Sequence, residues 1–263
     1  MELLISAVNA NVHELVEKMN IGTDAVLVNQ ASCDEEETIE KSSYTVRVYT
    51  RNERGVGRSR NLCLEKSTDE IVLFSDEDIV YKEGYNRMVT DAFEKHPEAD
   101  ILLFNVEVCP ERRTYWNEKY KKIGLMNLGR YPAYSIAARR KPLTESGVRY
   151  SLLFGGGAPY SNGEDSLFLA DCCRAGLKIY ACTDDIGCEQ PRQSTWFNGY
   201  TEKFFFDRGV LFYFLYRHAA ALWALRFVLV KKEMFNDGIK RKEAWKLILK
   251  GIKKGKEEIK KEK

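Results

Sequence analysis

Short apolar segments that alternate with helix-like segments fill the first part of the sequence, and they limit the possible folds more than any other feature. The apolar segments have the length of β-strands and lie at 3–8, 25–30, 44–50, 70–75 and 100–108. Strands that alternate with helices are typical of α/β proteins with a parallel sheet, in which ligands bind beyond the carboxyl ends of the strands. We therefore expect a mixed, mostly parallel central sheet flanked by helices, with any binding site at its carboxyl edge.

The connections and the later part of the domain are predicted in the same way. Asn11 is a suitable N-cap for a first helix. Further helices are predicted from the glycine-bearing turn after 50 through Ser67, at about 83–95, and at 163–176. Two more strands and a long irregular segment complete the prediction, at 133–138, 177–182 and 110–130 respectively.

Charge is distributed unevenly along the 263 residues, although the net charge is only +2. Residues 203–263 contain 17 Lys and Arg against 7 Asp and Glu, whereas the preceding residues contain 24 against 32. A basic end on an acidic body favours an anionic partner for that end, and an acidic body does not favour nucleic acid. We expect one α/β domain at 1–200 and a basic helical extension at 201–263.

Several classes of site and location are disfavoured by residue content. The seven cysteines form no CxxC pair, as is typical of reduced thiols in a cytosolic protein. The three histidines are far apart in the sequence, so a His-rich zinc site is not expected. The N-terminus has no basic segment followed by a long apolar one, so we expect no signal peptide and a cytoplasmic location.

The acidic triplet Asp76-Glu77-Asp78 directly follows the apolar strand at 70–75. If the backbone stays extended there, Asp76 and Asp78 point to the same side. Two carboxylates at a sheet edge suit Mg²⁺ or Mn²⁺, which take one or two protein carboxylates and complete their coordination with phosphate and water. The alternative is a solvated acidic turn.

Two other segments have residues suited to catalysis or anion binding. In "RNERGVGRSRNLCLEKS" at 51–67, the glycines precede a helix start, and Arg58 and Arg60 add donors for phosphate. In "GEDSLFL" at 163–169, Glu164 and Asp165 could supply a general base. Chance arginines at a helix start and acids that favour the helix dipole are the respective alternatives.

The order of these three segments resembles the family 2 glycosyltransferases with the GT-A fold, over about residues 1–200. "GVGRSRNLCLE" is similar to the "G…ARN…A" segment of the family, "VLFSDEDIVY" to its DxD strand, and the stretch from "GVRYSLLFGGGAPYSNGEDSLFL" to "GLKIYA" to its acceptor-side segment. The resemblance implies a metal-dependent transfer of a hexosyl group from a nucleotide sugar, with inversion at the anomeric carbon, in polysaccharide assembly.

The resemblance also implies roles for individual residues. Asp165 would be the catalytic base, oriented by Glu164, and Asp78 with Asp76 would hold Mg²⁺ or Mn²⁺. The donor, expected to be a UDP-sugar, would be contacted by Asn29, Gln30, Arg58, Arg60, Asn61, Asp76 and Glu77.

The sequence departs from the family pattern in two places. The second strand of the family often ends with a base-reading aspartate, where this chain has Asn29 and Gln30, which can still hydrogen-bond a uracil edge. Some members use a later histidine near the metal, but 185–196 contains none. Residues of that segment that could line the cleft instead are Gln190, Arg192, Ser194 and Trp196.

The basic C-terminal end combines an apolar run with a lysine-rich helix. The run at 209–230 is interrupted by Arg217, His218 and Arg226, which favours a buried or interfacial helix pair over a membrane span. Residues 240–263 have the pattern of a basic amphipathic helix, which favours an anionic membrane surface. A glycan or lipid-linked glycan acceptor at the inner face of the cell membrane is then expected. The alternative is a run that packs on the domain and a solvated tail.

Two other functions are alternatives to a glycosyltransferase. A metal-dependent nucleotidyltransferase usually has a glycine-rich loop after its first strand, but "SAVNANVHELV" contains no glycine there. A non-catalytic protein that binds the membrane surface would have inert acidic motifs, and substitution of Asp165 would then change nothing.

Overall fold

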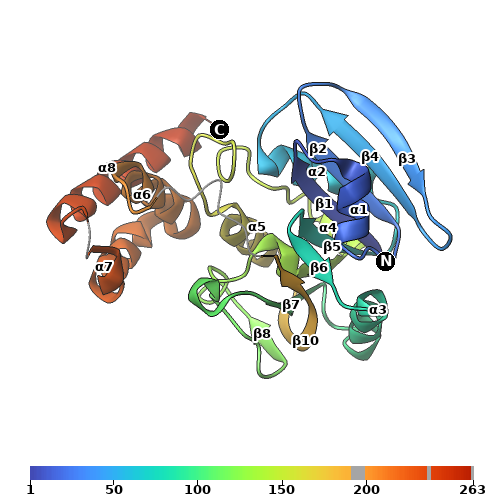
Figure 1. Ribbon diagram of the computed structural model, residues 1–263. Coiled ribbons are helices and arrows are strands. Elements are labelled where there is room, and N and C mark those ends of the chain that lie inside the picture. Colours follow the sequence, from blue (N-terminus) through green and yellow to red (C-terminus); the bar gives the residue numbers. More distant parts are fainter. Residues whose placement is uncertain (191–198, 236–237, 262–263) are drawn as a thin grey trace.

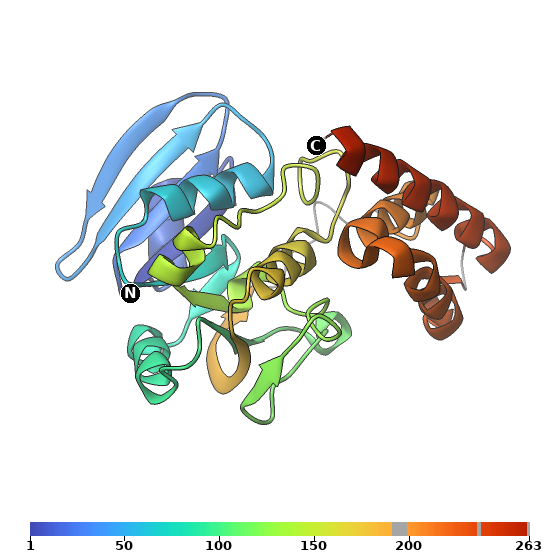
Figure 2. The ribbon, with the colours of Figure 1, turned by 180° about the vertical axis from the view of Figure 1, so that it is seen from behind.

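A computed structural model describes residues 1–190, 199–235 and 238–261 of the chain (Figure 1). A ten-stranded mixed sheet has the order β3-β4-β2-β1-β5-β9-β7-β10-β6, with β8 paired to β10. Helices lie on both faces of the sheet, and α6–α8 form a separate layer beside it (Figures 1 and 2). The predicted α/β class with a C-terminal helical extension is confirmed.

The first half of the sheet contains four parallel strands, of which the three inner ones are buried on both faces and the outer one, β4, on one face. It consists of β1 (Glu2–Val8), β2 (Ala25–Gln30), β4 (Thr45–Arg51) and β5 (Ile71–Asp76), in the order β4-β2-β1-β5. Residues of β1 alternate between two cores, as strand geometry requires, with Leu3 and Ile5 in one and Leu4 in the other. Both faces must therefore be covered by helices.

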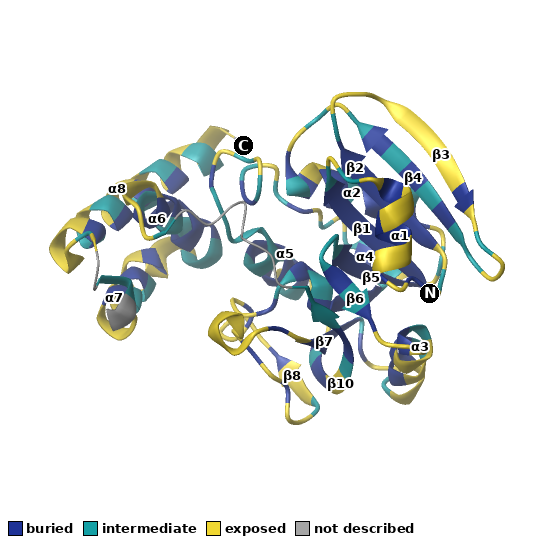
Figure 3. Cartoon of the chain, in the orientation of Figure 1, coloured by how far each residue is buried: buried dark blue, intermediate teal, exposed yellow. Residues whose placement is uncertain are grey.

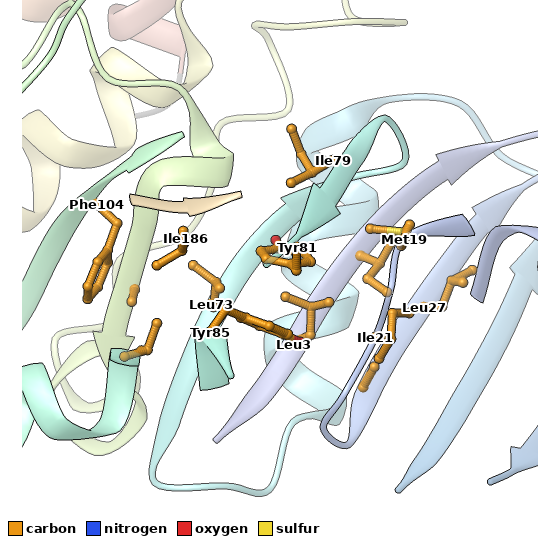
Figure 4. Close-up of a cluster of buried hydrophobic side chains, with 14 of the residues drawn as sticks. Leu3, Met19, Ile21, Leu27, Leu73, Ile79, Tyr81, Tyr85, Phe104 and Ile186 are labelled. Carbon is orange, nitrogen blue, oxygen red and sulfur yellow. The ribbon is translucent and has the colours of Figure 1, made fainter. Parts of the chain in front are cut away.

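Helices cover both faces of the sheet. On one face, α1 (Val12–Lys18) and α3 (Tyr85–Lys95) pack in the core shown in Figure 4, where Leu3 of β1 lies near Tyr85 of α3. On the other face, α2 (Val56–Lys66) and α5 (Glu164–Arg174) contribute buried residues such as Leu64 and Phe168 to the second core. The short helix α4 (Arg140–Glu145) belongs to this second core as well.

The second half of the sheet contains antiparallel strands, of which one overlaps the strand predicted at 133–138 and two, at 79–81 and 121–123, were not predicted. Between β5 and β7 (Ile101–Glu107), the strand β9 (Ile136–Arg139) runs antiparallel to both neighbours. β10 (Ile179–Glu189) is parallel to β7 and antiparallel to two short strands, β6 (Ile79–Tyr81) and β8 (Lys121–Ile123). At the opposite edge, β3 (Glu35–Glu40) pairs antiparallel with β4 and is largely exposed, with charged residues that discourage edge pairing (Figure 3).

The C-terminal extension folds as three helices, α6 (Glu202–Tyr216), α7 (Ala220–Val230) and α8 (Arg241–Lys261). Helices α6 and α8 approach very closely through glycines: a Cβ on Gly209 would lie 2.1 Å from the Ile248 carbonyl oxygen, and one on Gly251 would lie 2.0 Å from that of Phe206. The predicted helix pair at 209–230 is thus found in α6 and α7. None of the helices in the described ranges is long and apolar enough to cross a membrane.

The predicted role of the last helix needs a correction. Its basic amphipathic pattern is present in α8, but the buried residues Ala244, Ile248, Gly251 and Gly255 pack on the other C-terminal helices. The apolar stripe of α8 is therefore occupied by protein and is not free to lie on lipid.

Candidate active site

A cavity of about 190 Å³ opens at the carboxyl ends of the parallel strands. Val8, Gln30 and Asp76, which end or nearly end β1, β2 and β5, all reach it. The acidic triplet is therefore at the edge where the sequence places it. The remaining lining residues come from α2, β10, the start of α5 and nearby loops: Ser6, Val56, Arg60, Glu77, Asp78, Arg112, Tyr134, Gly156, Glu164 and Glu189.

Arg60 of α2 connects the glycine-arginine segment with the acidic triplet and with the acidic pair at the start of α5. Its Nη2 donates to Asp76 Oδ1 at 2.8 Å, and its Nη1 donates to Asp165 Oδ1 at 2.7 Å and lies 3.4 Å from Glu164 Oε1. The side chain is only 3% exposed, whereas those of Asp76, Glu164 and Asp165 are 31%, 15% and 19% exposed. One buried guanidinium thus holds carboxylates from β5 and α5 around one point.

Aromatic packing fixes the guanidinium in place. Arg60 lies over the Tyr150 ring at 5.1 Å, and that ring is stacked on Phe168 with centroids 4.0 Å apart. Burial disfavours the charged guanidinium, but the Asp165 and Asp76 carboxylates outweigh this, so the pKa of Arg60 is raised well above its ordinary value. Arg60 therefore stays charged, and its primary contacts are protein carboxylates.

Asp165 has an environment that suits proton transfer. Burial, together with the nearby carboxylates of Glu164 and Asp76, raises its pKa to about 8, while Arg60 and the Ala133 backbone N–H oppose the rise. A carboxylate whose pKa is raised towards neutrality is a stronger base than an ordinary aspartate. Because Glu164 precedes it at the start of α5, the two carboxylates reach the same arginine from one helical turn.

Asp76 ends β5, whereas Glu77 and Asp78 form the tight turn between β5 and β6, so the triplet is not extended throughout, which corrects the geometry expected from the sequence. Glu77 accepts a hydrogen bond from the Val8 backbone N–H at 3.1 Å, and the Asp78 carbonyl oxygen accepts one from the Gln190 N–H at 2.7 Å. These bonds tie the turn to the ends of β1 and β10. All three acidic side chains nevertheless reach the cavity.

The donor set of the cavity is compatible with a hard divalent cation. Asp76 and Asp78 present carboxylate oxygens, the ligand type that Mg²⁺ and Mn²⁺ prefer, and phosphate oxygens of a substrate could complete the coordination. Within the described ranges, no group of three or more His, Cys, Asp or Glu side chains is arranged to hold a metal by protein ligands alone. Any such ion would complete its coordination with substrate oxygens and water.

The glycine turn before α2 is already occupied by the protein. The Gly55 N–H donates to Gln30 Oε1 at 2.7 Å, and the Val56 N–H donates to the Gly156 carbonyl oxygen at 2.9 Å. A Cβ on Gly57 would lie 2.4 Å from the Ser151 carbonyl oxygen. The expectation that this helix start binds phosphate is thus wrong for these two N–H groups, and the glycines serve close packing between the turn and the 150–157 loop.

The residues predicted to contact the nucleotide are dispersed. Gln30 lines the cavity while its amide oxygen holds Gly55, but Asn29, Arg58 and Asn61 do not line it. The Asn29 amide bonds the backbone of Ala10, at 3.0 Å to N and 3.2 Å to O. The Asn61 amide bonds the Tyr150 backbone in both directions, and Arg58 is half exposed near Glu53.

Some cavity residues were not identified from the sequence. Arg112 lies in a 3-10 turn (Pro110–Arg112) of the segment predicted to be irregular, and it pairs with the buried Glu189 carboxylate of β10 at 2.7 Å. Burial is the main reason that the pKa of Tyr134, another lining residue, is raised. No local pattern marks Arg112 or Tyr134, because only the tertiary fold brings them to the sheet edge. Gln190 follows β10, while Arg192, Ser194 and Trp196 lie outside the described residues.

Comparisons with known proteins agree with this geometry. The profile described as "Glycosyl transferase family 2" matches residues 7–150 of the chain. A search of curated proteins found no match. Solved structures of Staphylococcus aureus TarS residues 1–349 have the same fold, in complex with UDP-GlcNAc (TM-score 0.60, 16% identity, 95% of this chain and 80% of that one) and alone (0.56, 13%, 96% and 71%). The full TarS structure matches with 13% identity at a TM-score of 0.56, over 96% of this chain and 43% of that one. The match to the family profile spans more than half of the 263 residues, and the chain belongs to glycosyl transferase family 2.

Proposed function

We propose that the protein transfers a hexosyl group from a nucleotide-diphosphate sugar, preferably a UDP-sugar, to an acceptor hydroxyl, with inversion at the anomeric carbon. The observation that carries the proposal is the cluster in which Arg60 gathers Asp76, Glu164 and Asp165. This cluster joins a candidate base to the carboxylates beside the donor cavity. Family membership supports the reaction class, and the TarS complexes with UDP-GlcNAc and UDP support a uridine nucleotide donor.

Asp165 acts as the base in this reaction. Its carboxylate takes the proton of the acceptor hydroxyl as that oxygen forms a bond to the anomeric carbon from the face opposite the diphosphate. The bond between the anomeric carbon and the diphosphate oxygen breaks, and its electron pair leaves with the nucleoside diphosphate. Glu164 and Arg60 orient the Asp165 carboxylate through the contacts described above.

The leaving diphosphate needs positive charge near the cavity, because negative charge grows on it as the bond breaks. Asp78, with Asp76, would hold Mg²⁺ or Mn²⁺, which would supply Lewis-acid stabilisation of the phosphate oxygens when bound. Arg112 also lines the cavity and contributes a guanidinium that can donate to phosphate. The cavity of about 190 Å³ is smaller than a typical ligand pocket, so it would take the diphosphate end of the donor.

A peripheral location at the inner face of the cell membrane is the second part of the proposal. Helix α7 exposes Leu222, Leu225 and Leu229, and Arg226 lies on the same helix. Exposed leucines beside cations suit an anionic membrane surface. Because the apolar stripe of α8 is packed, α7 replaces it as the proposed contact with lipid. Such a location suits an acceptor used in cell-surface polysaccharide synthesis.

Hydrolysis of a panel of nucleotide sugars by the purified protein, with and without Mn²⁺, tests the donor and the metal. We expect slow, metal-dependent release of UDP from one donor and its loss in Asp78→Ala. The exposed Asp91→Ala on α3 is the matched control. Turnover that is equal in both variants would exclude Asp78 as the metal ligand. No turnover and no binding of any nucleotide by the wild-type protein would overturn the proposed function.

Loss of the base is tested separately. We expect Asp165→Asn to lower the transfer rate by about 10²–10⁴-fold, the usual contribution of general base catalysis. Asp171→Asn, on the exposed side of the same helix, should leave the rate unchanged. If Asp165→Asn keeps wild-type activity, the acidic pair at the start of α5 has no role in proton transfer.

A further inference from the structure

A second and larger cavity lies between the α/β domain and the C-terminal helices. Its volume is about 540 Å³, within the range of ligand pockets. The domain contributes residues of the 114–130 segment and Ser166 of α5, and the C-terminal helices contribute residues of α6 and α7. No residue is shared with the lining of the donor cavity.

All ionisable side chains that line this second cavity and carry charge at neutral pH are cationic: Arg130, Arg208, Arg226 and Lys231. No Asp or Glu is among its described lining residues. This is notable in a chain with almost equal numbers of acidic and basic residues. A recess whose walls carry one sign of charge concentrates ligands of the opposite sign, so the cavity favours an anion.

Aromatic rings hold two of these guanidinium groups. Arg208 lies over Phe204 at 5.2 Å and over Phe227 at 5.7 Å, and Arg226 lies over Trp223 at 5.5 Å. A guanidinium fixed on an aromatic face keeps its N–H edge available for bidentate hydrogen bonds to phosphate. Two of these rings, Trp223 and Phe227, also line the cavity and give it an apolar wall, on which a ligand with both sugar and anionic groups can rest.

An unpaired hydrogen-bond donor on Arg208 is a second observation that points to a ligand. Its Nε is buried and has no hydrogen-bond partner among the described residues. An unpaired buried donor is costly, and such groups in native proteins call for an explanation such as a bound ion. Burial also lowers the pKa of Arg208, as expected for a cation without a carboxylate partner. A bound anion would satisfy both features.

The position of the cavity links it to the candidate base. Ser166, which lines it, directly follows Asp165 on α5. Leu211, another lining residue, contacts the helix start, since a Cβ on Gly163 would lie 2.2 Å from its Cδ2. The donor cavity reaches the same helix turn through Glu164. Asp165 is in neither lining, but the residues before and after it each line one cavity, so the two cavities meet the start of α5 on either side of the candidate base.

We propose that this second cavity binds a phosphate-bearing acceptor, with Arg208, Arg226 and Arg130 contacting the phosphate. The proposal rests on the proposed glycosyltransferase function and names the class of its acceptor. The phosphate could belong to a water-soluble phosphorylated glycan or to a lipid-linked one, and the two sources require the same recognition by arginine.

Binding of glucose 1-phosphate, measured by calorimetry in the presence of saturating UDP, tests the proposal. UDP fills the donor cavity, so that any remaining binding reports another site. Co-sedimentation with phosphatidylcholine vesicles that contain phosphatidic acid is the arm for a lipid-borne phosphate. We expect Arg226→Gln and Arg130→Gln, both at exposed positions, to weaken binding of the responsive probe about tenfold each, the usual loss for a charged hydrogen bond.

Several controls make the result specific. Arg87→Gln, an exposed arginine on α3, should bind like the wild type, and glucose without phosphate should not bind. Arg208→Gln should show the largest loss, but it can also disturb packing, so the exposed variants decide the question. Binding of glucose 1-phosphate alone indicates a soluble acceptor. Binding of vesicles alone indicates a lipid-linked acceptor if Arg130→Gln, outside α7, weakens it, whereas vesicle binding that only Arg226→Gln weakens reports the α7 surface and overturns the proposal.

The proposal is overturned if both probes bind Arg226→Gln and Arg130→Gln as tightly as they bind the wild type, or if neither probe binds the wild type. Failure of the proposed function is a separate outcome. It would appear as absence of UDP binding by the wild-type protein, and the same titrations without UDP would still test the second cavity.

Discussion

At the scale of single residues, Arg60 shows how burial changes the role of a side chain. From the sequence it was predicted to contact the nucleotide, because an arginine after a glycine turn suits phosphate. The structure places its guanidinium against Asp76, Glu164 and Asp165, and its pKa is raised by those carboxylates. Arg60 therefore sets the electrostatics of the candidate base, which gives a test of the assignment.

The pH dependence of transfer should report on Asp165. A base must be deprotonated, so kcat/KM falls as pH decreases through its pKa, which burial and the charges of Glu164 and Asp76 raise to about 8. Glu164→Gln removes one of these negative charges, so the pKa of Asp165 should decrease and the acidic limb of the kcat/KM profile should move to lower pH. Pre-steady-state or steady-state rates across the pH range measure this shift.

The control for this shift is Asp171→Asn, which removes a negative charge from the exposed part of α5. Its profile should coincide with that of the wild type. An acidic limb that does not move in Glu164→Gln would mean that another group controls the rate.

The positions of Asp165, Glu164, Asp76 and Asp78 at or beside the ends of elements were predictable because each belongs to a short motif, and their roles stay predictions. The hydrogen-bond partners of the other polar candidates were not predictable. Asn29 and Asn61 look equally suited to a ligand in the sequence, yet both amides bond the backbone. A polar side chain gives no local sign of whether a ligand or the main chain will satisfy it.

At the scale of elements, sequence pattern predicted the parallel strands, because β1, β2 and β5 are buried on both faces and mostly apolar, while β4 alternates apolar with polar residues. The short strands β6 and β8 pair with the distant β10 and have no pattern of their own, whereas β9 overlaps the strand predicted at 133–138. The amphipathic pattern of α8 was also visible, but a pattern shows that a face is buried without identifying what buries it. In this protein α6 covers the apolar stripe, through glycine contacts.

The glycine contact between α6 and α8 can be tested by Gly251→Ala. In a helix with open surroundings, this change stabilises by about 1 kcal/mol through helix propensity. Here the new Cβ would lie 2.0 Å from the Phe206 carbonyl oxygen, so we expect destabilisation of about 1–3 kcal/mol from overpacking. Urea unfolding measures the free energy of unfolding.

Gly124→Ala is the matched control, since nothing lies within 4 Å of its added Cβ. Its free energy of unfolding should differ little from that of the wild type. If Gly251→Ala proves more stable than the wild type, the helices do not pack at the distance described.

At the scale of the whole molecule, the expected division into residues 1–200 and 201–263 follows the change in charge, but packing crosses it. Phe154, Tyr160 and Leu167 of the α/β domain form one apolar cluster with Leu211 and Phe214 of α6. The Ser161 N–H also donates to the buried Asp207 carboxylate of α6 at 2.9 Å. Composition could reveal where the charge changes, whereas the shared cluster depends on contacts between residues far apart in the sequence.

A chain that ends at residue 200 should therefore be a poor folding unit. Phe154 and Leu167 are almost fully buried, and removal of α6 exposes them. The stability contributed by burial of each side chain then falls by about 1.5–3 kcal/mol. We expect a lower Tm, binding of a hydrophobic dye, and loss of transfer activity.

Leu222→Ser with Leu229→Ser in the full-length chain is the control, because these residues of α7 are already exposed and their loss should leave Tm unchanged. A shortened chain that unfolds cooperatively at the Tm of the full-length protein would show that the extension is an independent domain. The proposed acceptor cavity would then join two domains that fold separately, because its α6 and α7 wall belongs to the extension.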